Sequence, residues 1–240
     1  MTIRERLQIA YMKRLARSAE GRGFILRQLA DAESNGENQI FERLLAKVDD
    51  PQLQKLVEKH QADEVRHAHL YTKAAERQGV EKRPVPDHLK IIDRLDRAAG
   101  GFLNAPIESD RDVMEAYVML QVIEERGITQ FQLLEQAFRP YDAESADVIA
   151  EIAGDEERHL KYCLAISRRY APDEATRLAT LAKYRELEAK CFADNSQAMS
   201  EWTMEKGYFT GGPLARWFFS TMQGLGARQG LPYTTYAEAA

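Results

Sequence analysis

Hydrophobic residues recur every three to four positions over long stretches of this chain, a spacing that predicts amphipathic helices. No stretch shows the apolar and polar alternation of a half-buried strand. The sequence therefore predicts an all-α fold. Helices are expected over residues 3–19, 24–48, 51–78, 87–99, 110–138, 142–170, 173–206 and 214–228.

Capping residues group these helices into two hairpins. Asp50 and Pro51 supply an N-cap and a proline at the first helical position, and Asp142 caps the second helix of the other hairpin. Gly79 is expected to end the helix over 51–78. The long connection between the hairpins could carry the chain back along the bundle.

The two hairpins repeat each other. The motif Asp-Glu-x-Arg-His occurs at residues 63–67 and again at 155–159, and a shift of 92 positions aligns the two copies. The same shift places Asp50 on Asp142 and Phe41 on Leu133. Each hairpin is therefore expected to bury the same face.

A glutamate and a histidine three residues apart lie on one face of a helix, so each motif points a carboxylate and an imidazole the same way. One Glu-x-x-His occurs by chance on many polar helix surfaces. Two copies in register, each preceded by a helix that carries glutamates, predict a metal site.

The repeat also selects the glutamates of the preceding helices. Glu33 plus 92 is Glu125, whereas Glu37 would correspond to Thr129, a poor ligand. Glu33 and Glu64 lie 17 and 14 residues from Asp50, at similar heights above the turn. Glu33 and Glu125 are therefore the predicted pair, with Glu37 and Glu124 as alternates.

Six ligands follow from these arguments. Their four carboxylates would balance two divalent cations, and oxygen-rich ligation with one nitrogen per metal suits two iron ions, two manganese ions or a mixed pair. The predicted ligands, which are also the predicted catalytic residues through the metals, are Glu33, Glu64, His67, Glu125, Glu156 and His159.

Over residues 22–170 this pattern resembles the ferritin-like di-iron carboxylate superfamily, and the motif resembles that of di-iron oxygenase subunits. The resemblance implies a ferritin-like four-helix bundle with a long crossover between its second and third helices. Residues 171–240 would form a C-terminal helical extension within a single domain over 1–240. The resemblance also implies that Glu64 and Glu156 bridge the metals and that Glu33 and Glu125 bind terminally.

The same resemblance implies that the aspartates and arginines of the two motifs hold the ligating histidines in place. Alternatively, these side chains would form charge pairs on the helix surface. They are Asp63, Arg66, Asp155 and Arg158.

The implied function is a di-iron oxidase or oxygenase that activates dioxygen to oxidise a small organic substrate. No Cys-x-x-Cys motif is present, so an external electron donor is expected. The alternative is a ferroxidase or peroxide-scavenging, iron-handling protein without an organic substrate. A metal-free helical scaffold and a tRNA-hydroxylating enzyme are further possibilities.

Composition limits the remaining functions. A chain of 240 residues with 44% hydrophobic residues can bury one sizeable core, and a net charge of -5 gives no general basic field for nucleic acid. Two cysteines, the absence of a signal-peptide core and the absence of an apolar run of about 20 residues favour a cytoplasmic protein without a transmembrane segment.

Several other residues invite interpretation. Tyr71 and Cys163 occupy equivalent positions one turn beyond each motif, beside Tyr162, and are either redox-active or part of the core. His60, His69 and His88 lack repeat partners and are interpreted as structural or exposed. The C-terminal aromatic residues are expected to serve core or homodimer packing, with a substrate lid or a membrane-surface helix as alternatives. They are Trp202, Trp217, Phe218 and Phe219.

Overall fold

The computed structural model describes residues 3–35 and 37–228, and within them it contains helices and no strand. The all-α prediction is therefore confirmed. The helices are α1 (Ile3–Ala16), α2 (Ala19–Asn35), α3 (Glu37–Lys47), α4 (Pro51–Arg77), α5 (Ile91–Ala98), α6 (Asp110–Phe138), α7 (Ala143–Tyr170), α8 (Glu174–Glu205) and α9 (Pro213–Arg228), with short 3-10 turns η1 (Asp87–Leu89) and η2 (Phe102–Asn104).

The predicted capping residues begin and end these helices. The Asp50 carboxylate accepts hydrogen bonds from the backbone N–H groups of Gln52 and Leu53 at 2.8 and 3.2 Å, ahead of Pro51. The Asp142 side chain caps α7 in the same way. Gly79 adopts a φ of 65° directly after α4, a conformation that a glycine reaches without strain.

One predicted boundary lies elsewhere. Helix α1 ends at Ala16 and α2 begins at Ala19, so the boundary between the first two expected helices comes before Gly21 and Gly23, which lie inside α2. The helix expected over 24–48 corresponds to α2 and α3, whose described bounds stand on either side of residue 36. Residue 36 lies outside the described residues.

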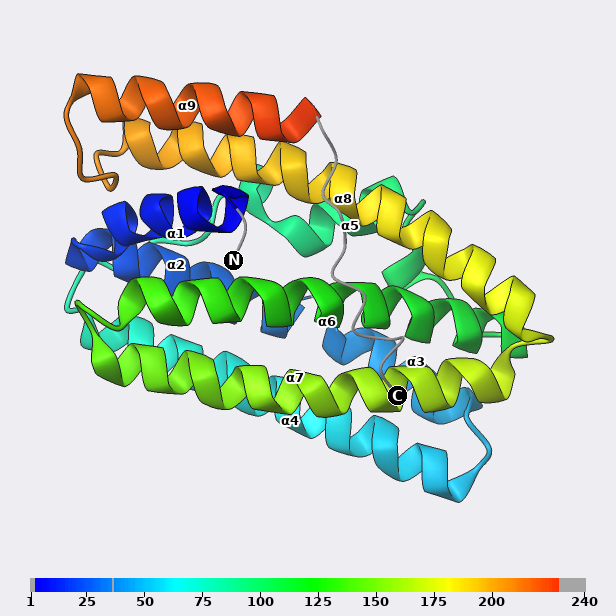
Figure 1. The fold of residues 1–240 in the computed structure, drawn as a ribbon. Helices are drawn as coiled ribbons and strands as arrows, with labels where there is room; N and C mark the ends of the chain where they lie inside the picture. The colour runs from blue at the N-terminus through cyan, green and yellow to red at the C-terminus, as the bar shows by residue number, and fades with distance from the viewer. Residues whose placement is uncertain (1–2, 36, 229–240) are drawn as a thin grey trace.

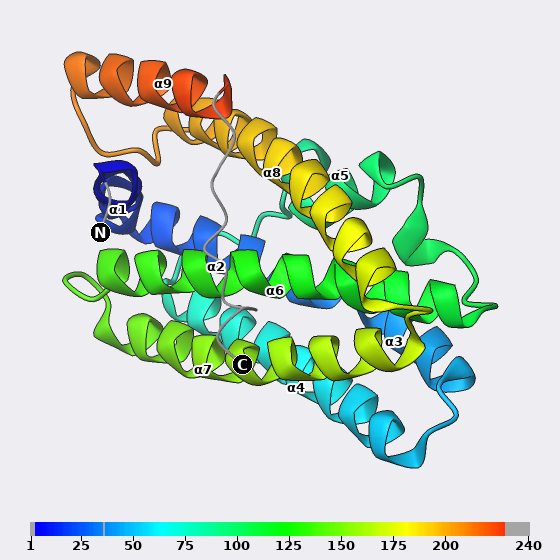
Figure 2. The same ribbon diagram turned by 45° about the vertical axis from the view of Figure 1, so that its right-hand side comes forward.

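The helices lie in three layers (Figure 1). Helices α4 and α7 form one outer layer, α2, α3 and α6 the middle one, and α1, α5, α8 and α9 the other outer layer. Helices α6 and α7 form one hairpin, and α2 with α3 packs on α4 to form the other. Figure 2 shows α8 crossing over α6 from the end near α7 and diverging from it toward α9.

Two hydrophobic clusters fill the space between the layers. One contains Phe24, Leu26 and Phe131, and the other contains Phe41, Leu44 and Ile166. The acidic and imidazole side chains of the repeated motifs lie between these two clusters. The core thus shields the motifs from solvent at both ends of the bundle.

The C-terminal aromatic residues divide between core and surface. Trp202 stacks on Phe24 with ring centroids 4.5 Å apart, and Phe219 lies in the first hydrophobic cluster. Trp217 and Phe218 on α9 are 65% and 39% exposed. Among the described helices, none is both long and apolar enough to cross a membrane.

Candidate metal centre

Seven buried side chains from four helices meet in the middle of the bundle. They form two groups, in each of which one ligand atom per residue lies within 4.8 Å of the others. The first group is Glu33, Glu64, His67 and Glu156, and the second is His60, Glu64, Glu124 and His159. Glu64 belongs to both groups, so they form one continuous centre.

In the first group, the Nδ1 atom of His67 faces the carboxylates. It lies 3.3 Å from Glu156 Oε1, 3.7 Å from Glu33 Oε2 and 3.8 Å from Glu64 Oε1. Glu33 comes from α2, Glu64 and His67 from α4, and Glu156 from α7. Three helices therefore converge on one nitrogen atom.

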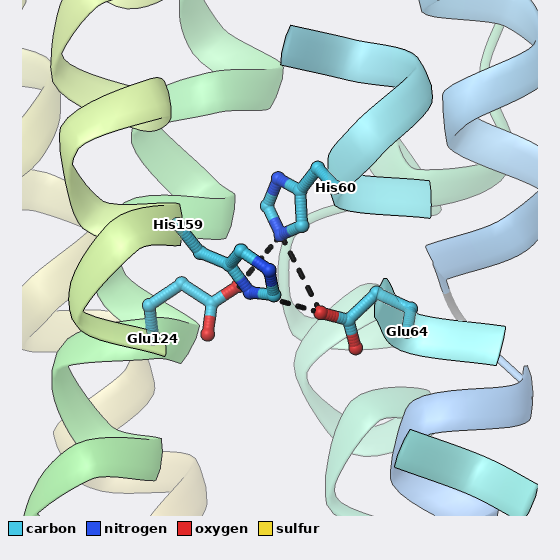
Figure 3. Close-up of side chains that lie close together, drawn as sticks. All are labelled: His60, Glu64, Glu124 and His159. Atoms are coloured by element: carbon cyan, nitrogen blue, oxygen red, sulfur yellow. Dashed lines mark hydrogen bonds and ion pairs between the residues drawn. The ribbon is translucent and has the colours of Figure 1, made fainter. Parts of the chain in front are cut away.

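The second group is built around Nδ1 of His159, which lies 2.6 Å from Glu156 Oε2, 3.1 Å from Glu64 Oε1 and 3.7 Å from Glu124 Oε1. Glu156 therefore contacts both motif histidines, as Glu64 does. Figure 3 shows His60 reaching into this group from α4, with its Nε2 2.9 Å from Glu124 Oε1 and 3.6 Å from Glu64 Oε1.

The other imidazole nitrogen of each motif histidine is held by the aspartate of the opposite motif. His67 Nε2 lies 3.2 Å from Asp155 Oδ2, and His159 Nε2 lies 3.4 Å from Asp63 Oδ2. An N–H donated from Nε2 to a carboxylate leaves the Nδ1 lone pair directed at the centre. Each aspartate thus contacts the histidine of the opposite motif, across the α4–α7 pair.

The arginines of the motifs bind the same aspartates. Arg158 Nη1 lies 2.5 Å from Asp155 Oδ1 and its Nη2 3.4 Å from Asp63 Oδ2, while Arg66 bonds to Asp155 and to Glu151. Burial by itself raises the pKa of Asp155, but hydrogen bonds from Arg158 and His67 outweigh it and lower that pKa. The aspartate therefore stays ionised as an acceptor.

The centre carries an excess of negative charge. Burial lowers the pKa of His67, but its contacts with Glu156 and Glu33 outweigh burial and raise that pKa to about 10. Contacts with Glu124 and Glu156 likewise overcome burial and raise the pKa of His159 to about 11. Burial and the neighbouring Glu124 raise the pKa of Glu156. The carboxylates therefore stabilise a positive charge in the centre, whether it is carried by a protonated imidazole or by a metal ion.

The residues fit a pair of metal ions. His67 Nδ1 is fully buried and has no hydrogen-bond partner, although it faces three carboxylates. An unpartnered buried nitrogen is costly unless something else satisfies it. A divalent cation would satisfy this lone pair and neutralise the carboxylates together.

One predicted ligand lies elsewhere. Glu125 is buried on the opposite side of α6, where its carboxylate pairs with Arg185 of α8 at 2.6 and 2.9 Å and accepts a hydrogen bond from Gln121 at 2.9 Å. The alternate Glu124 occupies the centre in its place. Glu124 lies one residue before the position that the shift of 92 assigns to the partner of Glu33, so the two hairpins differ in register by one residue at this height.

His60, interpreted from the sequence as structural or exposed, is fully buried and joins the second group of the centre. Burial and the nearby His159 lower its pKa well below the usual value, which keeps the ring neutral. The shift of 92 pairs it with Ile152, so the repeat gave no signal. Its spacing four residues before Glu64 was the available signal, because that places both on one helix face.

The remaining candidates are placed as follows. His69 and His88 are exposed, as one of the interpretations expected. Tyr71 is fully buried and its hydroxyl has no hydrogen-bond partner, and Cys163 is buried in the core. The side chain of Glu37 lies outside the described residues.

Comparison of the chain with protein-family models, curated proteins and solved structures gives no match. The centre is therefore interpreted from its own geometry.

Proposed function

We propose that the protein is a dinuclear metal oxidoreductase of the ferritin-like kind, which binds two iron ions and uses dioxygen to oxidise or oxygenate a small organic substrate. One observation carries the proposal: Glu64 and Glu156 each contact both inward-facing imidazoles, and the two buried ligand groups share Glu64. Shared carboxylates hold two ions close together.

Two reduced iron ions bound in this centre would supply the electrons that reduce dioxygen. The chain supplies their surroundings. Glu33 would bind one ion and Glu124 the other, in terminal positions, while Asp155 and Asp63 fix the imidazole tautomers. Manganese, alone or with iron, would fit the same oxygen-rich set.

The donor sets of the two ions are unequal. One group contains the single imidazole of His67, and the other contains the imidazoles of His159 and His60. Imidazole is a softer donor than a carboxylate and carries no charge, so the two ions would have different surroundings.

A cavity favours an organic substrate over iron handling alone. It has a volume of about 480 Å³ and a mostly apolar lining, and the four carboxylates of the centre line part of it. Pockets for small organic molecules are of this size and character. A protein that only oxidised ferrous iron would need a polar path to the centre instead.

The test is to load the protein with ferrous iron without oxygen, confirm the metal content by elemental analysis, and mix it rapidly with dissolved dioxygen. We expect an absorbance change that Glu64→Ala with Glu156→Ala abolishes. No change in loaded protein would refute the proposal. Ferroxidase turnover with many iron ions retained per chain would support the iron-handling alternative.

A further inference from the structure

We propose that the cavity above the metal centre binds a neutral, largely apolar molecule that carries one hydrogen-bond donor, such as a hydroxyl or amide N–H. This inference rests on the proposed function for its chemistry, because it names the class of substrate that the centre would oxidise. The binding site itself is argued from the cavity lining.

The cavity lies between the middle layer and the outer layer of α1, α5, α8 and α9. Its floor contains the carboxylates of the centre, and its walls contain Ile123 and Phe131 of α6 and Phe192 and Met199 of α8. Figures 1 and 2 show α8 diverging from α6 along this region. The extension after the four-helix core therefore forms much of the wall.

The charges along the cavity disfavour an anionic ligand. Its two cationic lining residues among those described are both engaged: Arg126 forms two bonds of 3.0 and 2.9 Å with Glu188, and Lys90 lies 3.2 Å from Asp87. Asp93 adds further negative charge to the wall. A carboxylate or phosphate would find no cationic side chain in the lining that is not already paired with a carboxylate.

One buried polar atom in the wall, the Oδ1 of Asn195, lacks a hydrogen-bond partner. Asn195 of α8 is 7% exposed, lines the cavity, and its Oδ1 has no hydrogen-bond partner. A buried acceptor left unpaired is costly, and a donor on a bound molecule would satisfy it. A few fixed polar groups in an apolar pocket are what orient a small ligand.

A larger side chain in place of Gly127 would fill part of the cavity. It lines the cavity one turn beyond Glu124, and a Cβ built on it would meet only the ring of Phe131, at 3.6 Å, an ordinary contact. Alanine therefore fits at this position, whereas a leucine side chain would extend into the space beside the carboxylates. Gly154, inside α7 and exposed, offers a control because a Cβ there meets nothing within 4 Å.

The experiment uses displacement of the neutral fluorescent dye Nile red from metal-loaded protein by three matched probes: 1-decanol, its methyl ether, and decanoate. We expect decanol to compete about fivefold better than the ether, because only decanol donates a hydrogen bond, and decanoate to compete least. Asn195→Leu should remove the difference between decanol and ether. Gly127→Leu should weaken decanol binding at least tenfold, while Gly127→Ala and Gly154→Leu retain it.

Three results would overturn the inference: decanoate competing as well as decanol, equal competition by decanol and ether in the unaltered protein, or unchanged decanol binding in Gly127→Leu. Metal content is measured on the same samples. Protein that binds decanol in the expected pattern but holds no metal would refute the proposed function alone. Protein that reacts with dioxygen but does not bind decanol would refute this inference alone.

Discussion

At the scale of single residues, the identity of the site depends on which of two adjacent glutamates faces inward. Successive residues of a helix point about 100° apart. Glu124 therefore reaches the centre, with its Oε1 3.7 Å from His159 Nδ1, while Glu125 faces α8 and pairs with Arg185. Of two neighbouring glutamates, one lies in the candidate metal centre and the other forms an ion pair between two helices.

Removing each carboxylate should separate these roles. We expect Glu124→Gln to lower the iron content from about two ions per chain toward one. We expect Glu125→Gln to keep both ions but to lower the free energy of unfolding by about 2 kcal/mol, because a charge-assisted pair with Arg185 is lost. Elemental analysis and urea unfolding of the two variants provide the measurements.

The reverse pattern, with metal lost in the Glu125 variant and retained in the Glu124 variant, would show that the register of α6 is not the one described.

At the scale of helices, the aspartate caps fix where each hairpin turns and so set the height of the motifs. Asp142 accepts a hydrogen bond from the backbone N–H of Ser145 at 3.1 Å, from its hydroxyl at 2.6 Å and from Gln78 at 2.7 Å. Burial by itself raises the pKa of Asp142, but these hydrogen bonds outweigh burial and lower it. The ionised carboxylate is thus preferred in the folded state.

A lowered pKa gives this cap a pH-dependent contribution to stability. The contribution is fully present above the pKa of the unfolded aspartate, about 3.9, and is lost as the pH falls through the lower pKa of the folded state. We expect Asp142→Ala to cost about 1 kcal/mol near neutral pH and less in strong acid. Urea unfolding across this pH range measures both values.

Asp142→Asn is the control, because asparagine keeps an acceptor oxygen but does not ionise in this range. Its stability difference from Asp142→Ala should not change with pH. A pH-dependent difference between these two variants would mean that another group is responsible.

At the scale of the whole molecule, the candidate metal centre places four carboxylates between two hydrophobic clusters. Like charges at this depth oppose folding unless cations balance them. The centre connects α2, α4, α6 and α7, so bound ions would tie both hairpins together.

Metal removal should therefore lower the stability of the entire bundle. With free ferrous or manganous ion at 100 times its dissociation constant, linkage predicts about 2.7 kcal/mol of added stability. We expect the melting temperature to fall on treatment with a chelator and to recover on adding the ion. Glu64→Ala with Glu156→Ala should melt at one temperature in either condition, and a wild-type melting temperature indifferent to metal would contradict the role of the centre.

Much of this architecture could be predicted from local signals. Helical periodicity depends on residues near one another in the chain, and so do the N-caps at Asp50 and Asp142 and the helix end at Gly79. These features could therefore be predicted from the sequence alone. The motif residues also lie on predictable helix faces, and Glu64, His67, Glu156 and His159 do meet.

The remaining features depend on how helices pack. By itself, the sequence determined the helices, the two hairpins and the duplicated motif, because each follows from short-range spacing. Only the tertiary structure decided that Glu124 replaces Glu125, that His60 joins the centre and that each aspartate serves the opposite histidine. The reason is that these contacts join residues far apart in the chain. Which face of α6 points inward depends on how α6 packs against α7 and α8, and a crossed contact between α4 and α7 has no signature within either helix.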